Sequence, residues 1–116
     1  QSEDSSLVVV GRTKHYGGPF KITTLADLYE DKFEVMTLNT RSGFRYLSYL
    51  PSLYIDKLRG TSGVFFSKTD TVLCDPLDDS PVYAQVDGEP LGRLPVEFKI
   101  VPEALKVLIP ENSNKI

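Results

Sequence analysis

Residues 82–100 read VYAQVDGEPLGRLPVEFKI. Two runs in this stretch, 82–86 and 96–100, alternate apolar and polar side chains, which is the pattern of half-buried β-strands. The dipeptide Asp87-Gly88 follows the first run, and this pair is a strong turn signal because glycine accepts positive φ. The stretch therefore predicts short strands connected by tight turns.

The rest of the chain repeats this pattern, with one exception. Short β-branched or alternating runs recur at roughly ten-residue spacing, with Gly, Pro and Asp between them. The other predicted strands cover residues 7–10, 20–24, 33–40, 64–66, 71–74 and 104–109. Apolar residues in 43–59 recur instead at helical spacing, with Pro51 as a kink. We expect a mainly β fold, an antiparallel sandwich or barrel with one helical insertion around residues 43–59.

Composition excludes several classes of function. The chain has 116 residues, enough for one small domain. Its net charge is −3, whereas a nucleic-acid-binding protein is expected to carry a basic surface. No run approaches the roughly 20 apolar residues that cross a bilayer. Cys74 is the only cysteine, which rules out an intrachain disulfide and fits the cytoplasm, and His15 is the only histidine, which rules out a two-histidine zinc site.

Three acidic clusters are candidate sites, at residues 75–79, 27–31 and 87–89. A solvated loop is the simplest interpretation of the first cluster, and the second is compatible with a cation site or with a polar loop. Asp87 and Glu89 also allow two interpretations. They belong to a structural turn, or one of them accepts the proton of a substrate hydroxyl as the oxygen attacks. Residue types alone leave both open.

Residues 86–110, VDGEPLGRLPVEFKIVPEALKVLIP, closely resemble the C-terminal stretch of the diacylglycerol kinase and sphingosine kinase family of lipid kinases. The upstream matches, looser but in the same order and spacing, are Gly17-Gly18, Ala26-Asp27-Leu28 and the stretch from Asp31 to Val35. The resemblance spans about residues 7–110, between a polar leader at 1–6 and a polar tail at 111–116.

This resemblance implies the C-terminal β-sandwich domain of a two-domain enzyme. Such enzymes use magnesium and ATP to phosphorylate a lipid alcohol such as diacylglycerol or a sphingoid base, and the proton acceptor falls on Asp87 or Glu89. The family's nucleotide-binding motif, GGDGT, does not occur in this chain. We therefore expect a C-terminal domain that lacks its nucleotide-binding partner, and an isolated chain without kinase activity.

The resemblance also implies a structural magnesium ion. Its ligands fall on the Asp31 side chain and on the carbonyl groups of Leu28 and Phe33. The sequence departs from the family pattern here, because Lys32 stands where glycine is frequent. The ammonium group of Lys32 beside the site would weaken the binding of the magnesium ion or take its place.

Two further interpretations concern partners. The tyrosines and basic residues of 43–59 suit a lipid-headgroup surface and predict peripheral membrane contact, although packing against the sheet is the simpler use. The competing class of function is a non-enzymatic β-sandwich module that binds a lipid or a protein. The reading frame upstream of Gln1 distinguishes this module from a kinase.

Overall fold

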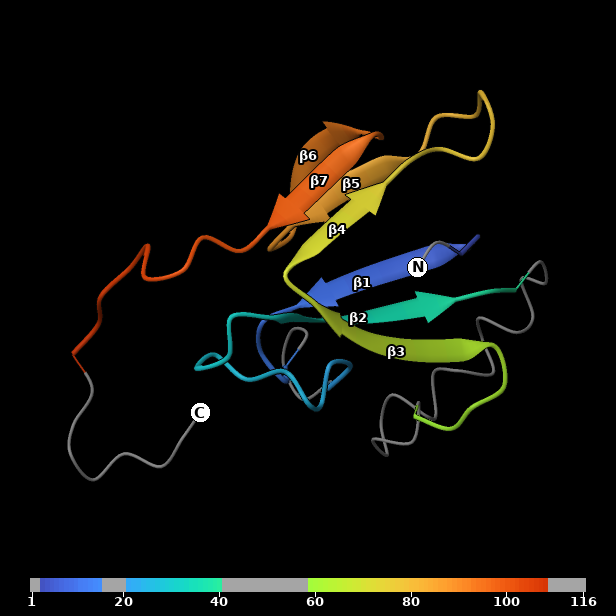
Figure 1. Ribbon diagram of the computed structural model, residues 1–116. Helices are drawn as coiled ribbons and strands as arrows, with labels where there is room; N and C mark the ends of the chain where they lie inside the picture. Colours follow the sequence, from blue (N-terminus) through green and yellow to red (C-terminus); the bar gives the residue numbers. More distant parts are fainter. Residues whose placement is uncertain (1–2, 16–20, 41–58, 109–116) are drawn as a thin grey trace.

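The computed structural model describes residues 3–15, 21–40 and 59–108 (Figure 1). Every regular element in these ranges is a β-strand, and every strand pairing is antiparallel. The strands are β1 (Leu7–Gly11), β2 (Phe33–Leu38), β3 (Val64–Thr69), β4 (Thr71–Cys74), β5 (Tyr83–Val86), β6 (Glu89–Arg93) and β7 (Val96–Lys99). The prediction of a mainly β, sandwich-like domain is confirmed.

The predicted helix around 43–59 lies outside the described residues except for Arg59, which forms a turn with Gly60. Among the residues that the structure describes, no helix is long and apolar enough to span a membrane. The predicted membrane-facing surface of 43–59 likewise falls outside these ranges.

β2 is the central strand of a three-stranded sheet with the order β1-β2-β3. Met36 of β2 pairs with Val9 of β1 and with Phe66 of β3. Successive side chains of a strand point to opposite faces, and both Val35 and Met36 are buried, so β2 is covered on both sides. The apolar alternation from residue 33 onward therefore marks the centre of the sheet.

The hydrophobic core lies on the Met36 face of this sheet. Its buried members are Ile22, Met36, Leu38 and Val64, and Val9 and Phe66 pack against them. Ile22 belongs to the run 20–24, which the sequence predicted to be a strand. That prediction is wrong for the described part: Lys21 makes one isolated bridge to His15, and the chain then turns at Thr23, whose carbonyl accepts from the Ala26 N–H at 3.2 Å.

Glu34 shares the core face of β2 and is only 2% exposed. Its carboxylate accepts a hydrogen bond from the Leu25 N–H at 2.7 Å and forms an ion pair with Arg59. The Arg59 guanidinium also lies 4.1 Å from the centre of the Phe66 ring. A buried carboxylate is costly unless it is paired and hydrogen-bonded. These contacts meet that requirement and attach the loop before β2 to the sheet.

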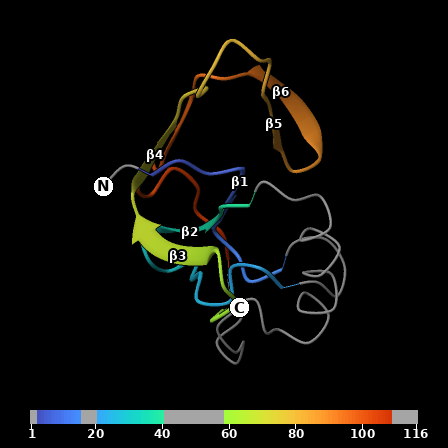
Figure 2. The same cartoon turned by 90° about the vertical axis from the view of Figure 1, so that its right-hand side faces the viewer.

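The remaining strands form two smaller ribbons, in which β4 pairs with β7 and β5 pairs with β6. In both views β5 and β6 lie beyond β1, at the end of the molecule away from β3, and β4 leads toward them from the end of β3 (Figures 1 and 2). The sequence patterns do not predict strand β6. The predicted strand at 104–109 is not formed over its described part, 104–108, because no described strand pairs with it, and Leu105 is 81% exposed.

Candidate functional site

The turn of the β5–β6 ribbon carries both predicted catalytic carboxylates, and we call this ribbon the acidic hairpin. Val86 pairs with Glu89, so Asp87 and Gly88 are the two residues of the turn. Their φ angles are 50° and 84°. Positive φ at both central positions defines a type I′ turn, which favours Asn-Gly and Asp-Gly. The turn thus explains why position 88 is glycine. It does not explain why positions 87 and 89 are carboxylates, because the turn does not require an acidic side chain at either position.

The opposite end of the acidic hairpin is fixed by several contacts. Tyr83 pairs with Arg93, and the Arg93 guanidinium lies 5.5 Å from the centre of the Tyr83 ring. Just beyond this pair, the Leu94 N–H donates to the Val82 carbonyl at 2.9 Å. These contacts hold the two strands together at the open end of the hairpin. The turn at the other end, with the two carboxylates, is exposed to solvent.

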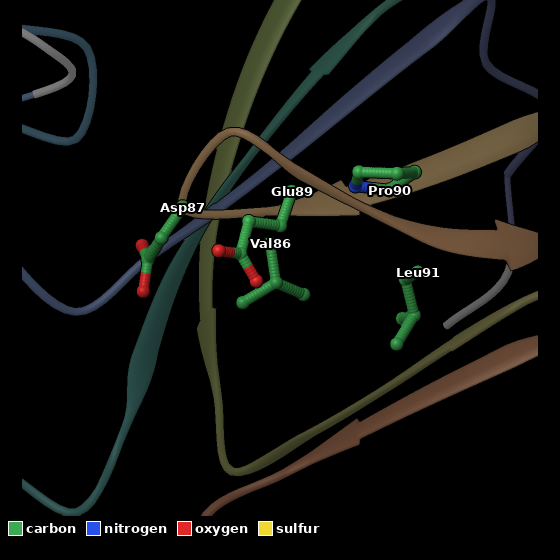
Figure 3. A pocket seen from close by; sticks show the side chains of 5 residues that line it. All are labelled: Val86, Asp87, Glu89, Pro90 and Leu91. Atoms are coloured by element: carbon green, nitrogen blue, oxygen red, sulfur yellow. The ribbon is translucent and has the colours of Figure 1, made fainter.

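Asp87 and Glu89 line a shallow, open hollow of about 380 Å³ (Figure 3). Its other lining residues are Val86, Pro90 and Leu91. Val86 is 44% exposed and Leu91 is 53% exposed, so apolar side chains face solvent beside the carboxylates. This arrangement can accept a proton from a hydroxyl while contacting an apolar chain attached to it. Among the described residues that line the hollow none is cationic, so these residues offer no side-chain partner for phosphate groups.

The acidic loop at 75–79 shows the features of a solvated turn. The Ser80 N–H donates to Asp78 Oδ1 at 2.8 Å, and this hydrogen bond lowers the pKa of Asp78. At the start of the loop, burial and, second, the charge of Asp75 raise the pKa of the Cys74 thiol. Within the described ranges, no group of three or more His, Cys, Asp or Glu side chains is arranged to hold a metal ion.

The residues with implied magnesium ligands lie in and next to the loop before β2. Asp31 is exposed, and Phe33 is the first residue of the strand. The Leu28 carbonyl, however, accepts a hydrogen bond from Arg12 Nη2 at 3.1 Å. Arg12 Nη1 donates to the Glu30 carbonyl as well. One of the three expected metal ligands, the Leu28 carbonyl, therefore already accepts from a cationic side chain.

Sequence reasoning missed Arg12, although the signal existed. Arg12 directly follows β1, and the last residue of that strand, Gly11, pairs with Glu34 near the start of β2. In an antiparallel pair, the residue after one strand lies beside the loop before the other. Pairing of the runs 7–10 and 33–40 would thus have placed Arg12 beside the 27–31 loop.

Residues 1–109 match the family model described as the YegS C-terminal NAD kinase beta sandwich-like domain. The chain belongs to this family. As a YegS C-terminal domain it is a kinase-associated β-sandwich, which confirms the resemblance to lipid-kinase C-terminal domains at the level of the family. No curated protein and no solved structure matches the chain.

Proposed function

We propose that this domain supplies the proton acceptor of an ATP-dependent lipid kinase, whose acceptor substrate is a lipid alcohol such as diacylglycerol or a sphingoid base. One observation carries the proposal: the carboxylates of Asp87 and Glu89 and the apolar side chains of Val86 and Leu91 line the same exposed hollow. A lipid alcohol presents this combination of groups, because its hydroxyl is attached to an apolar body.

The step that we propose uses these carboxylates as the proton acceptor. The hydroxyl oxygen attacks the γ-phosphorus of ATP, its proton passes to Asp87 or Glu89, and the bond from the γ-phosphorus to the bridging oxygen breaks as ADP leaves. Phosphoryl transfer depends mainly on positioning and charge neutralisation, and a general base adds about 10²–10⁴-fold. Magnesium bound with ATP would supply the charge neutralisation. Asp87 and Glu89 supply only the acceptor for the proton.

A lipid acceptor fits the hollow better than a dinucleotide acceptor does. The family description mentions NAD kinase, whose substrate carries phosphate groups. Two carboxylates, with no cation among the described lining residues, disfavour an acceptor that carries phosphate groups of its own without magnesium, whereas Pro90 and Leu91 favour hydrocarbon. The electrostatics of the acidic hairpin therefore support a neutral or cationic alcohol with an apolar tail.

The exposure of the acidic hairpin also supports a second domain across the hollow. All five residues of β6 are exposed, and a two-stranded hairpin is marginally stable in water unless another element covers it. We place a nucleotide-binding domain opposite the hairpin, so that ATP and the lipid meet between the two domains. Because the lipid arrives from a bilayer, we propose peripheral contact with the cytoplasmic face of a membrane.

The test compares phosphate acceptors in separate assays of the full-length protein. Radiolabelled ATP is offered with mixed micelles of diacylglycerol, with sphingosine micelles, or with NAD. We expect labelled lipid and no labelled NADP, and residues 1–116 alone should transfer no phosphate and bind ATP no more tightly than the millimolar range. Labelled NADP alone would overturn the lipid assignment. Vesicle binding without transfer to any acceptor would favour the non-enzymatic module.

A further inference from the structure

The 27–31 loop is held by a side chain at the place where the family resemblance puts magnesium. Two of its carbonyl groups, those of Leu28 and Glu30, accept hydrogen bonds from the two terminal nitrogens of Arg12. We propose that the Arg12 guanidinium replaces a structural metal ion in this domain and fixes the loop without magnesium. This proposal is independent of the catalytic role assigned to the acidic hairpin.

The geometry of the loop suits a forked donor. The Glu30 N–H donates to the Asp27 carbonyl at 3.1 Å, and the Tyr29 N–H donates to Asp27 Oδ1 at 2.9 Å. These bonds close a turn from which the Leu28 and Glu30 carbonyls reach the same guanidinium. A planar guanidinium presents several N–H groups in a fixed fork, so it can bind two carbonyl oxygens at once.

The charges around the loop leave little attraction for a dication. Lys68 Nζ lies 2.6 Å from Glu30 Oε2, and a second hollow of about 380 Å³ is lined by Glu30, Asp31, Lys32 and Lys68. Together with Arg12, three cationic side chains adjoin the three carboxylates of the loop, those of Asp27, Glu30 and Asp31, so no net negative charge is left to attract a dication. Magnesium binds oxygen at about 2.1 Å, so an ion on the Leu28 carbonyl would lie within about 5 Å of Arg12 Nη2 and be repelled by it.

The pairing of β1 with β2 explains why this position is available to arginine. Gly11 pairs with Glu34, so the chain leaves β1 beside the loop that leads into β2. Arg12 is the first residue after β1 and needs only its own length to reach the loop carbonyls. The replacement therefore follows from strand register and depends on no distant segment of the chain.

Hydrogen exchange of a peptide covering residues 25–34 tests the proposal in the full-length protein. Exchange is measured without nucleotide, in EDTA and in MgCl₂ at matched ionic strength. The wild type should exchange equally in both solutions, because its loop is held by Arg12. Arg12→Met should exchange about tenfold faster in EDTA, since it loses two charge-assisted hydrogen bonds. Lys14→Met removes the same charge from an exposed neighbour and should match the wild type.

A second variant asks whether the guanidinium occupies a metal position. Arg12→Met combined with Lys32→Gly removes two cations and leaves the Leu28 carbonyl and the Asp31 carboxylate for a metal. In this variant MgCl₂ should restore slow exchange of the 25–34 peptide. Magnesium-dependent exchange in the wild type, wild-type exchange in Arg12→Met, or no magnesium response in the double variant would each overturn the proposal.

Discussion

Val86 and Glu89 are cross-strand partners, and this pairing leaves Asp87 and Gly88 as the whole turn of the acidic hairpin. One carboxylate thus belongs to the turn and the other begins the returning strand. Because asparagine is also favoured at the first central position of a type I′ turn, Asp87→Asn removes the charge and keeps the turn. Catalysis and folding can therefore be separated by conservative substitutions.

Gly88→Ala should destabilise the protein through the backbone alone. A Cβ at Gly88 meets no atom within 4 Å, but the φ of 84° is unfavourable for an L-residue. We expect a loss of about 1 kcal/mol in the free energy of unfolding, measured by urea denaturation. Gly88→Asn should lose less, because asparagine tolerates the left-handed region. Equal losses in the two variants would contradict the type I′ assignment.

The ion pair of Glu34 with Arg59 should be worth much more than the exposed pair of Glu30 with Lys68. Arg59→Met leaves a buried carboxylate without its cation, and we expect a loss of roughly 3 kcal/mol in unfolding free energy. Lys68→Met breaks the exposed pair and should cost less than about 1 kcal/mol. Chemical denaturation checks both values, and a similar small loss in the two variants would argue against a structural role for Arg59.

Gly11 should not tolerate a side chain, because Thr23 occupies the space. A Cβ there would overlap Thr23 Oγ1 and lie 2.7 Å from Cγ2, and Thr23 is buried with its hydroxyl donating to the Thr13 carbonyl at 2.6 Å. We expect Gly11→Ala to cost about 1–3 kcal/mol. In a double-mutant cycle, Gly11→Ala with Thr23→Ala should cost less than the sum of the single variants. Strict additivity would show that the two sites do not interfere.

Cys74 should react slowly with iodoacetamide in the folded protein. Burial and, second, Asp75 raise the pKa of its thiol, so a smaller fraction is thiolate at a given pH and the rate profile shifts to higher pH. Unfolding in urea should accelerate alkylation at pH 8, and Asp75→Asn should accelerate it in the folded state. Asp78→Asn, which changes an exposed carboxylate of the same loop, serves as the control and should have little effect. A rate unaffected by unfolding would contradict the raised pKa.

Local patterns in the sequence predicted much of the fold. The alternation in 33–40 and 96–100 and the Asp87-Gly88 turn are local signals, and the structure forms strands and a turn there. Strand β6 was missed because Glu-Pro-Leu-Gly-Arg contains residues that strands disfavour, and its pairing follows from the turn. The run 20–24 was misassigned because a loop that lies on a sheet can bury Ile22 as a strand would.

The candidate site was only partly predictable for the same reason. Asp87 and Glu89 stand out as acidic residues at a turn, but their proposed catalytic role rests on the family resemblance. The partnership of Arg12 with the 27–31 loop spans 16 residues of sequence to Leu28 and depends on the register of β1 with β2. Contacts of this kind depend on which strands pair and in what register, so a short sequence motif cannot predict them.

The most direct test of the account is the turnover of the full-length kinase with Asp87→Asn and with Glu89→Gln. If one of these carboxylates accepts the hydroxyl proton, that variant should lose about 10²–10⁴-fold in kcat while its circular dichroism and unfolding midpoint stay near those of the wild type. Asp79→Asn, an exposed carboxylate in the 75–79 loop, should turn over as the wild type does. Wild-type turnover in both hairpin variants would contradict the proposed role of the acidic hairpin.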